Sequence, residues 1–344
     1  MNLIYDHGGD IYGTSAELDF SVNTNPFGIS EAVKNVYFDS VRLIEKYPDS
    51  DCRILCKKIA DYENRDTKSI CVTPENIFCG NGAADIIYKI IYALRPKTAL
   101  LTAPTFSEYE NALRSIGCGI HRHYLKEENG FVMDGSYLEE KHADIAFICN
   151  PNNPTGRAAD SRLLQRIAEK CRAEGAILVI DECFADLADI ETMRNDAVVI
   201  KAFTKTFAMA GLRLGYVIGD TKIIEKIKRV SPPWGVGSVT LKCAEAAIGD
   251  TEYIEASRAF IKSEMRFMYE ALNRISGVKA FKSDVNFILF KANPGLYEGL
   301  LERGILIRDC SNFEGLGEGF FRVGLKLRKE NIRLLEEIEK WQCR

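Results

Sequence analysis

The stretch ADIAFICNPNNPTGRAADSRLLQRIAEKCRAEGAILVIDE, residues 143–182, carries the pattern that decides the fold. It begins and ends with a continuous apolar run, at 143–150 and 175–182, and between them apolar residues recur at helical spacing over 161–174. Short apolar runs of this kind are typical of strands buried on both faces of a parallel sheet. A strand, a helix and a second strand in that order predict a βαβ unit, whose ligand-binding loops follow the carboxyl ends of the strands.

Further apolar runs extend the alternation on both sides of this unit. They are TALLTAP at 98–104, AVVIKAF at 197–203 and GYVIGD at 215–220, and GIHRHYL at 119–125 is a further strand candidate in which His121 and His123 stand at alternate positions. We therefore expect an α/β fold with a mostly parallel, doubly wound sheet in a large domain.

The pattern changes beyond residue 232. A helical stretch over 240–274, which we expect to bend at Gly249 and Asp250, precedes short strand-like runs within 281–326. This order indicates a small α+β domain. The expected parts are an N-terminal arm at 1–30 that packs with the small domain, a large domain at 31–232 and a small C-terminal domain at 233–344.

Composition excludes several classes of function. A formal net charge of −4 provides no basic surface for nucleic acid, and we expect no nucleic-acid partner. The chain has no apolar run of about 18 residues and begins without the basic and apolar regions of a signal peptide, so we expect no membrane partner and a cytoplasmic location. The 11 cysteines form no CxxC pair and the four histidines no HExxH, which argues against a metal site.

The sharpest local signal is Lys205, which follows the apolar run at 197–203 and precedes Arg213 in GLRLGY. A lysine at the end of a buried strand can enter a partly desolvated pocket, where its pKa falls and its amine can condense with an aldehyde. An arginine nearby suits a phosphate, because its planar fork binds two oxygens at once. Taken alone, Lys205 would be interpreted as a solvated surface lysine.

Three other polar segments stand at predicted strand or helix ends. Residues 150–156 read NPNNPTG and form a rigid turn, Asp181 and Glu182 end the second apolar run, and GNGAAD at 80–85 opens a predicted helix. A carboxylate at the end of a buried strand is costly unless paired, so Asp181 either holds a structural cation or faces a cationic ligand such as a pyridinium. Small residues at a helix N-terminus favour phosphate, although the GNGAAD segment is a poor dinucleotide fingerprint.

The order and spacing of the Asn-Pro-Thr-Gly segment, Asp181, Lys205 and Arg213 resemble fold-type-I pyridoxal-phosphate enzymes of the class I and II aminotransferase superfamily. The resemblance covers nearly the whole chain. It implies that Lys205 carries pyridoxal 5'-phosphate as a Schiff base, that Asp181 pairs with the ring nitrogen, that Asn153 bonds the phenolic oxygen and that Tyr109 stacks on the ring.

The resemblance also assigns the cofactor phosphate. It implies that the phosphate is held by Gly82, Ala83, Ala84, Thr204 and Arg213, and by Tyr47 from the partner subunit of a homodimer with shared active sites. Many members of the superfamily have serine where this chain has Ala202, which removes one phosphate donor.

Within the superfamily, the chain looks most like the threonine-phosphate decarboxylases of the cobalamin pathway. The segments that carry this likeness are HGG at 7–9, DFSVNTNPFG at 19–28, Phe184, IRDCSN at 307–312 and FRV at 321–323. The likeness implies that Arg322 binds the substrate α-carboxylate and that Arg308, His7 and Asn23 bind its phosphate.

The predicted function is therefore decarboxylation of a phosphorylated amino acid, L-threonine O-3-phosphate or L-serine O-phosphate, to the amino-alcohol phosphate. One alternative is an aminotransferase such as histidinol-phosphate aminotransferase. A second is a cofactor-binding module without catalytic activity. The single methyl group that separates the two candidate substrates is worth roughly 1–3 kcal/mol, and no motif reports on it.

Overall fold

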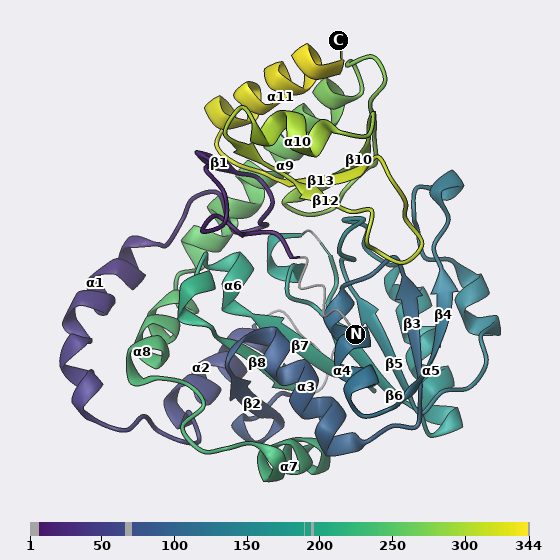
Figure 1. Ribbon diagram of the computed structural model, residues 1–344. Coiled ribbons are helices and arrows are strands. Elements are labelled where there is room, and N and C mark those ends of the chain that lie inside the picture. Colours follow the sequence, from purple (N-terminus) through teal and green to yellow (C-terminus); the bar gives the residue numbers. More distant parts are fainter. Residues whose placement is uncertain (1–6, 66–70, 189, 194–195, 343–344) are drawn as a thin grey trace.

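The computed structural model describes residues 7–65, 71–188, 190–193 and 196–342. A large lower part is built around a 7-stranded sheet, and a smaller upper part contains a 4-stranded sheet (Figure 1). The order of the large sheet is β2-β8-β7-β6-β5-β3-β4. Its strands are β2 (Ile77–Gly80), β3 (Thr98–Ala103), β4 (Gly119–Tyr124), β5 (Ile145–Cys149), β6 (Ile177–Asp181), β7 (Val198–Ala202) and β8 (Gly215–Ile218).

The pairing of the large sheet confirms a mostly parallel α/β fold. β4, β3, β5, β6 and β7 are parallel neighbours, whereas β8 is antiparallel to both β7 and β2. A parallel return needs a crossover long enough to reach the other end of the sheet. Between β7 and β8 the chain forms only α6 (Phe203–Thr206) and the 3-10 helix η6 (Ala210–Leu212), so it turns back at the same edge.

Helix α5 (Ser161–Glu174) illustrates how the local sequence sets these elements. Asp160 accepts hydrogen bonds from the first backbone N–H groups of the helix, and Gly175 ends it in the left-handed conformation. Its buried face includes Leu164 and Ile167, which lie at helical spacing and pack against the sheet.

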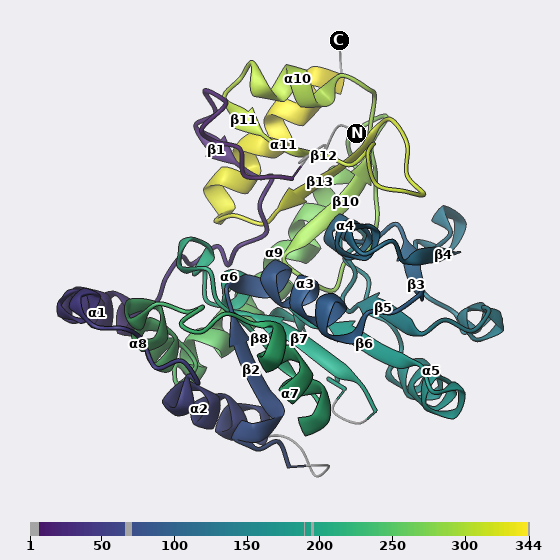
Figure 2. The ribbon, with the colours of Figure 1, turned by 60° about the horizontal axis from the view of Figure 1, so that its bottom comes forward.

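Helices cover both faces of the large sheet. One face packs against α3 (Gly82–Leu94), α4 (Ser107–Ser115) and α7 (Thr221–Val230). The other packs against α5 near β5 and β6, and against α2 (Arg53–Glu63) and α8 (Ser238–Ala247) near β8 and β2. Helix α1 (Glu31–Asp39) lies beside α8 at one end of this part in both views (Figures 1 and 2).

The upper part has its own apolar core. Its elements are α9 (Thr251–Leu272), α10 (Leu296–Leu301), α11 (Arg328–Gln342), β9 (Lys279–Ala280), β10 (Phe287–Lys291), β12 (Arg308–Asp309) and β13 (Phe320–Gly324). The N-terminal arm joins it, because β1 (Leu18–Asp19) pairs with β11 (Ile305–Leu306), as Figure 2 shows. The expected interruption at Gly249 and Asp250 separates α8 from α9. Helix α8 packs into the lower core, and α9 contributes Ile254 to that core and continues into the upper core from Ile261 onward. The domain boundary at residue 232 stays a prediction.

No helix among the described residues is both long and apolar enough to span a membrane.

Candidate active site

The polar segments predicted from the sequence meet at one edge of the large sheet. The carboxyl ends of β5, β6 and β7 lie side by side there, because these strands are parallel neighbours. A cavity of about 240 Å³ lies at this edge and is lined by residues of the large sheet, the N-terminal arm and the upper part. The predicted site residues that line it are His7, Asn23, Ala83, Ala84, Tyr109, Asn153, Asp181, Thr204, Lys205, Arg213, Arg308 and Arg322.

Lys205 lies on α6, directly after β7. Its Nζ atom is 5.7 Å from the centre of the Phe184 ring. Burial, followed by the positive charge of Arg322, lowers the pKa of Lys205 to about 8. Roughly a tenth of this amine is therefore neutral at pH 7, a far larger fraction than for a lysine with the ordinary pKa near 10.4, and the neutral form is the nucleophile toward a carbonyl group.

Asp181 ends β6 and is buried at the cavity. The Tyr109 hydroxyl donates to Asp181 Oδ2 at 2.7 Å, and the Cys183 backbone N–H donates to Oδ1 at 3.0 Å. Burial raises the pKa of Asp181, and the hydrogen bonds from Cys183 and Tyr109 oppose this shift. A carboxylate held in this way is suited to a cationic group within the cavity.

Tyr109 is enclosed by other side chains, with 0% of its surface exposed. Its ring stacks on Phe147 at a centroid distance of 5.2 Å, and Phe106 meets it edge-on at 5.6 Å. Phe106 lines the cavity as well and is only partly buried. The stacking of Tyr109 on a cofactor ring stays a prediction. What the Tyr109 hydroxyl does in the structure is to donate a hydrogen bond to Asp181.

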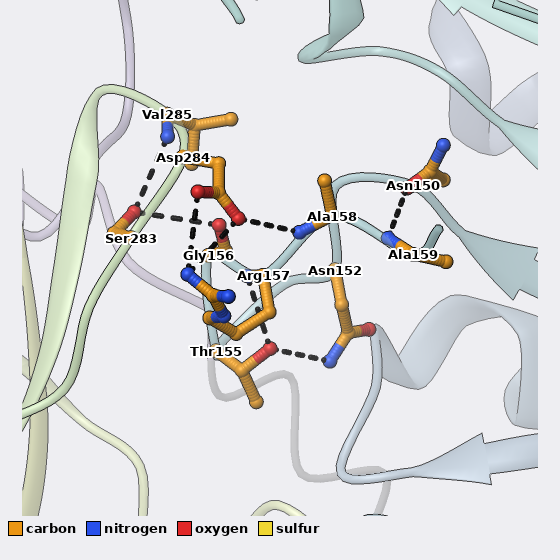
Figure 3. A network of polar contacts seen from close by, with 10 residues as sticks. All are labelled: Asn150, Asn152, Thr155, Gly156, Arg157, Ala158, Ala159, Ser283, Asp284 and Val285. Atoms are coloured by element: carbon orange, nitrogen blue, oxygen red, sulfur yellow. Dashed lines mark hydrogen bonds and ion pairs between the residues drawn. The ribbon is translucent and has the colours of Figure 1, made fainter. Parts of the chain in front are cut away.

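The turn after β5 is fastened to the large part through Asn152, which Figure 3 shows bonded to Thr155 within the turn. Asn152 Nδ2 donates to the Thr155 hydroxyl at 3.0 Å and to the Pro104 carbonyl at 2.9 Å. The Asn150 side chain accepts a hydrogen bond of 2.9 Å from the Ala159 N–H. These bonds fix the backbone on both sides of Asn153 before any ligand binds.

The same turn is also fastened to the upper part (Figure 3). The Asp284 N–H donates to the Gly156 carbonyl at 2.8 Å, and the Asp284 carboxylate accepts from the Ala158 N–H at 2.8 Å. Gly156 has a φ of +72°, and a Cβ atom there would lie 2.2 Å from the Ser283 hydroxyl. Only glycine allows this close approach, so the turn and the 283–285 segment form one packed seam.

Two arginines form the cationic end of the cavity. Arg308 on β12 and Arg322 on β13 are directly paired across the strands. Arg322 donates through Nη1 to Asn153 Oδ1 and through Nη2 to the Ser21 carbonyl at 2.9 Å. Burial lowers the pKa of Arg322 to about 10, which leaves it cationic at neutral pH. Among the described residues, Arg322 Nε and Asn23 Oδ1 are buried without a hydrogen-bond partner.

The start of α3 lies against the Arg213 guanidinium. Gly82 has a φ of +85°, and a Cβ atom there would lie 2.6 Å from Arg213 Nη2. The Arg213 guanidinium therefore lies against the first turn of α3, beside Ala83 and Ala84 and across from Thr204 on α6. Helix N-termini and arginine forks both favour phosphate oxygens.

Tyr47 does not gather with the other predicted residues. Its side chain is 81% exposed, its ring lies 4.8 Å from the Trp234 ring, and it is outside the set of described residues that line the cavity. Gly82 also stands just outside that set, next to Ala83. Several lining residues were not predicted individually; they are Phe106, Cys149, Cys183 and Phe313, and also Gly8, Ser21 and Val22 within the segments at 7–9 and 19–28. For Phe106 a signal existed, since it closely follows the predicted strand at 98–104.

The described part of the chain contains no cluster of three or more His, Cys, Asp or Glu side chains arranged to hold a metal ion.

Comparisons with known proteins agree with this geometry. The sequence matches the family "Aminotransferase class I and II" over residues 15–338. Threonine-phosphate decarboxylase from Salmonella typhimurium is 33% identical, with 96% of this chain and 94% of the relative covered. Histidinol-phosphate aminotransferase 2 from Archaeoglobus fulgidus is 31% identical, with 93% and 92% covered.

Among solved structures, the histidinol-phosphate aminotransferase from Clostridium acetobutylicum superimposes with a TM-score of 0.87 at 30% identity, covering 95% of this chain and 99% of that one. The sequence match and the superposition both extend over nearly the full length. The chain belongs to the class I and II aminotransferase family and is an enzyme of this kind.

Proposed function

We propose that this enzyme binds pyridoxal 5'-phosphate and decarboxylates L-threonine O-3-phosphate, with L-serine O-phosphate as a close alternative substrate. The observation that carries the proposal is the pairing of Arg308 with Arg322 in the cavity that contains the low-pKa amine of Lys205. Two adjacent guanidinium groups suit a substrate with two anionic ends. The product would be an amino-alcohol phosphate, as the cobalamin side arm requires.

The side chains present fit the cofactor. Gly82, Ala83, Ala84, Thr204 and Arg213 would hold its phosphate, Asp181 would face its ring nitrogen and Asn153 its phenolic oxygen. Ala202 leaves one phosphate donor fewer than a serine would. Because Tyr109 is enclosed and bonded to Asp181, we propose that Phe106 takes the place against the ring. When bound, pyridoxal phosphate supplies an electron sink for the bond that breaks at the substrate α-carbon.

The protein's own part in the reaction is orientation and proton transfer. Arg322 would hold the substrate α-carboxylate, and Arg308, His7 and Asn23 would hold its phosphate. Held at both ends, the substrate cannot rotate freely, so the bond to the carboxylate can be kept in the reactive alignment. After carbon dioxide leaves, the Lys205 amine can deliver a proton to the α-carbon.

Product analysis tests the proposed reaction. The purified enzyme is incubated with threonine phosphate, with and without 2-oxoglutarate, and carbon dioxide, aminopropanol phosphate and glutamate are measured. Carbon dioxide is expected at equal rates in both mixtures, because loss of the carboxylate needs no amino acceptor. Faster formation of glutamate from histidinol phosphate and 2-oxoglutarate would make the enzyme an aminotransferase. Absence of turnover with every substrate would support a silent binding module.

Replacing Arg308 by alanine should change substrate preference. Loss of one charge-assisted contact to the phosphate is expected to lower kcat/KM for threonine phosphate by roughly 10- to 100-fold, a cost of about 1.5–3 kcal/mol. Unphosphorylated threonine should be much less affected. Arg322→Ala is the matched control, since it should impair both substrates alike. Equal losses with both substrates for Arg308→Ala would contradict the assignment.

We also propose that the enzyme is a homodimer whose Tyr47 reaches the cofactor phosphate of the partner subunit. The segment around Tyr47 in the chain contains several exposed apolar side chains, Tyr37, Phe38, Val41, Ile44 and Ile54, and the Tyr47 ring contacts the exposed Trp234 ring. Exposed apolar side chains favour association with another protein surface. Tyr47→Ala should weaken cofactor binding, whereas Tyr12→Ala, at a tyrosine of the N-terminal arm with 95% of its surface exposed, should not. Sedimentation and cofactor titration test both points, and a fully active monomer would contradict the proposal.

A further inference from the structure

Asn25 joins the N-terminal arm to the turn that carries Lys205. Its side chain is buried, with 2% of its surface exposed. The Asn25 N–H donates to the Lys205 carbonyl at 3.0 Å, and Asn25 Nδ2 donates to the Thr206 carbonyl at 2.9 Å. Neither bond touches the Lys205 amine, so Asn25 acts on the backbone of this lysine.

These two bonds meet a need of the short helix α6. The last carbonyl groups of any helix lack partners within it, and α6 has only 4 residues. Lys205 and Thr206 are its last two residues. Asn25 is the donor to the Thr206 carbonyl and the nearer donor to the Lys205 carbonyl, which also accepts from the Ala208 N–H at 3.4 Å, so both carbonyls are satisfied without water.

The same amide also contacts helix α9 of the upper part. Asn25 Nδ2 donates to the Ser257 hydroxyl at 2.7 Å, and the Ser257 hydroxyl donates to the Tyr253 carbonyl at 2.6 Å. Asn25 Oδ1 accepts from the Phe27 N–H at 3.0 Å, which fixes the orientation of the amide. Three segments that are distant in sequence, the arm, α6 and α9, therefore meet at one side chain.

The arm that Asn25 anchors also lines the cavity. Asn23, two residues earlier, is a lining residue, and its carbonyl accepts from Asn286 Nδ2 at 3.0 Å. A displacement of Asn25 would thus move the Lys205 turn and the substrate-facing arm together.

We propose that Asn25 is a positioning residue for Lys205: it holds the lysine backbone against the arm and α9, so that the amine stays in the water-poor part of the cavity. This inference rests on the proposed function only in so far as the Lys205 amine takes part in the proposed reaction. Its test therefore measures the amine directly in the cofactor-free protein.

The experiment compares Asn25→Ala with Asn331→Ala. Asn331 is the matched control, because it is also fully buried and donates to a backbone carbonyl, that of Lys326 at 2.7 Å, but it lies within the upper part. The rate at which acetic anhydride labels Lys205 is measured by mass spectrometry from pH 6 to 11. This range begins about two units below the pKa of Lys205 in the folded protein and includes the ordinary lysine pKa near 10.4. Urea unfolding of both variants reports any general loss of stability.

In the wild-type protein the labelling rate should rise through a midpoint near pH 8, because burial favours the neutral amine. Asn25→Ala keeps the backbone N–H that donates to the Lys205 carbonyl but removes the Nδ2 donor to the Thr206 carbonyl and the Ser257 hydroxyl. Without these side-chain bonds the turn is no longer tied to α9 and the amine can reach water, so the midpoint should move up by about one unit and labelling at pH 7 should slow about tenfold. The groups that face the amine, Asp181, Cys183, Arg213 and Arg322, are the same in every variant. Asn331→Ala should keep the wild-type midpoint.

Two results would overturn the inference: a wild-type midpoint in Asn25→Ala, or the same shift in both alanine variants. If Asn25→Ala does not fold, Asn25→Ser, which has a short side-chain donor in addition to the backbone N–H that both variants keep, is measured in its place and should show a smaller shift in the same direction. Carbon dioxide release is assayed separately, so a failure of the proposed reaction leaves the labelling result interpretable.

Discussion

Lys205→Ala should lower carbon dioxide release from threonine phosphate by at least about 1,000-fold, because the variant loses both the covalent anchor for the cofactor and the proton donor to the α-carbon. The fold should survive, since only the far end of the side chain serves the cavity and the backbone bonds from Asn25 remain. Steady-state assays of the variant, with cofactor added in excess, measure the loss.

Lys205→Arg and Lys201 provide the controls. Lys205→Arg keeps the positive charge but cannot form the covalent bond, so it should be as inactive as the alanine variant. Lys201, four residues earlier on β7, is a buried lysine whose amine is held by Asp186 at 2.7 Å and Glu63 at 3.0 Å. Borohydride reduction followed by peptide mapping should therefore attach the cofactor to Lys205. An adduct on Lys201 or any other lysine, or substantial turnover in Lys205→Arg, would refute the assignment.

Asp181→Asn should lower kcat by about 100- to 1,000-fold while the protein still binds some cofactor. The amide keeps the size of the side chain but removes the negative charge that favours a protonated ring nitrogen, and such preorganised electrostatic contacts carry losses of this order. Cofactor content and kcat are measured on the same preparation, so that a binding defect is separated from a catalytic one.

Tyr109→Phe serves as the graded comparison for Asp181→Asn. It removes only the hydroxyl that donates to Asp181 at 2.7 Å and leaves the ring packed on Phe147. Loss of one hydrogen bond to a charged acceptor should cost about 10-fold in kcat. If Asp181→Asn kept near-normal turnover, the carboxylate would have no electrostatic role. If Tyr109→Phe were as inactive as Asp181→Asn, the hydroxyl would act on more than Asp181.

Much of the large sheet was predictable because each strand is a short apolar run with its own polar end. Asp181 ends β6 and Lys205 follows β7. Because these two strands are parallel neighbours, both residues lie at the same edge of the sheet. The strand at 215–220 was also found, but its direction was not. The direction depends on how far the chain travels between β7 and β8, and apolar periodicity carries no information about that distance.

The finer assignment of the aromatic residues needed three-dimensional packing. Phe106 and Tyr109 are three residues apart around the start of α4, and the sequence alone does not say which one is enclosed. The structure places the Tyr109 hydroxyl on Asp181, a contact between residues 72 positions apart. Asn25 was hidden for the same reason, since its partners lie near positions 205 and 257. The role proposed for Tyr47 would depend on a second chain, which one sequence does not place.

The seam between the turn after β5 and the 283–285 segment limits how this enzyme can be divided. Apolar side chains of both parts share one core, with Ile148 and Ile180 from the large sheet packed together with Phe281 and Leu289. A fragment ending near residue 232 would expose that core to water, and the turn after β5 would lose its hydrogen bonds to the 283–285 segment. Recombination with a relative would therefore have to exchange both sides of the seam together, and we expect that the large part would not fold as a separate fragment.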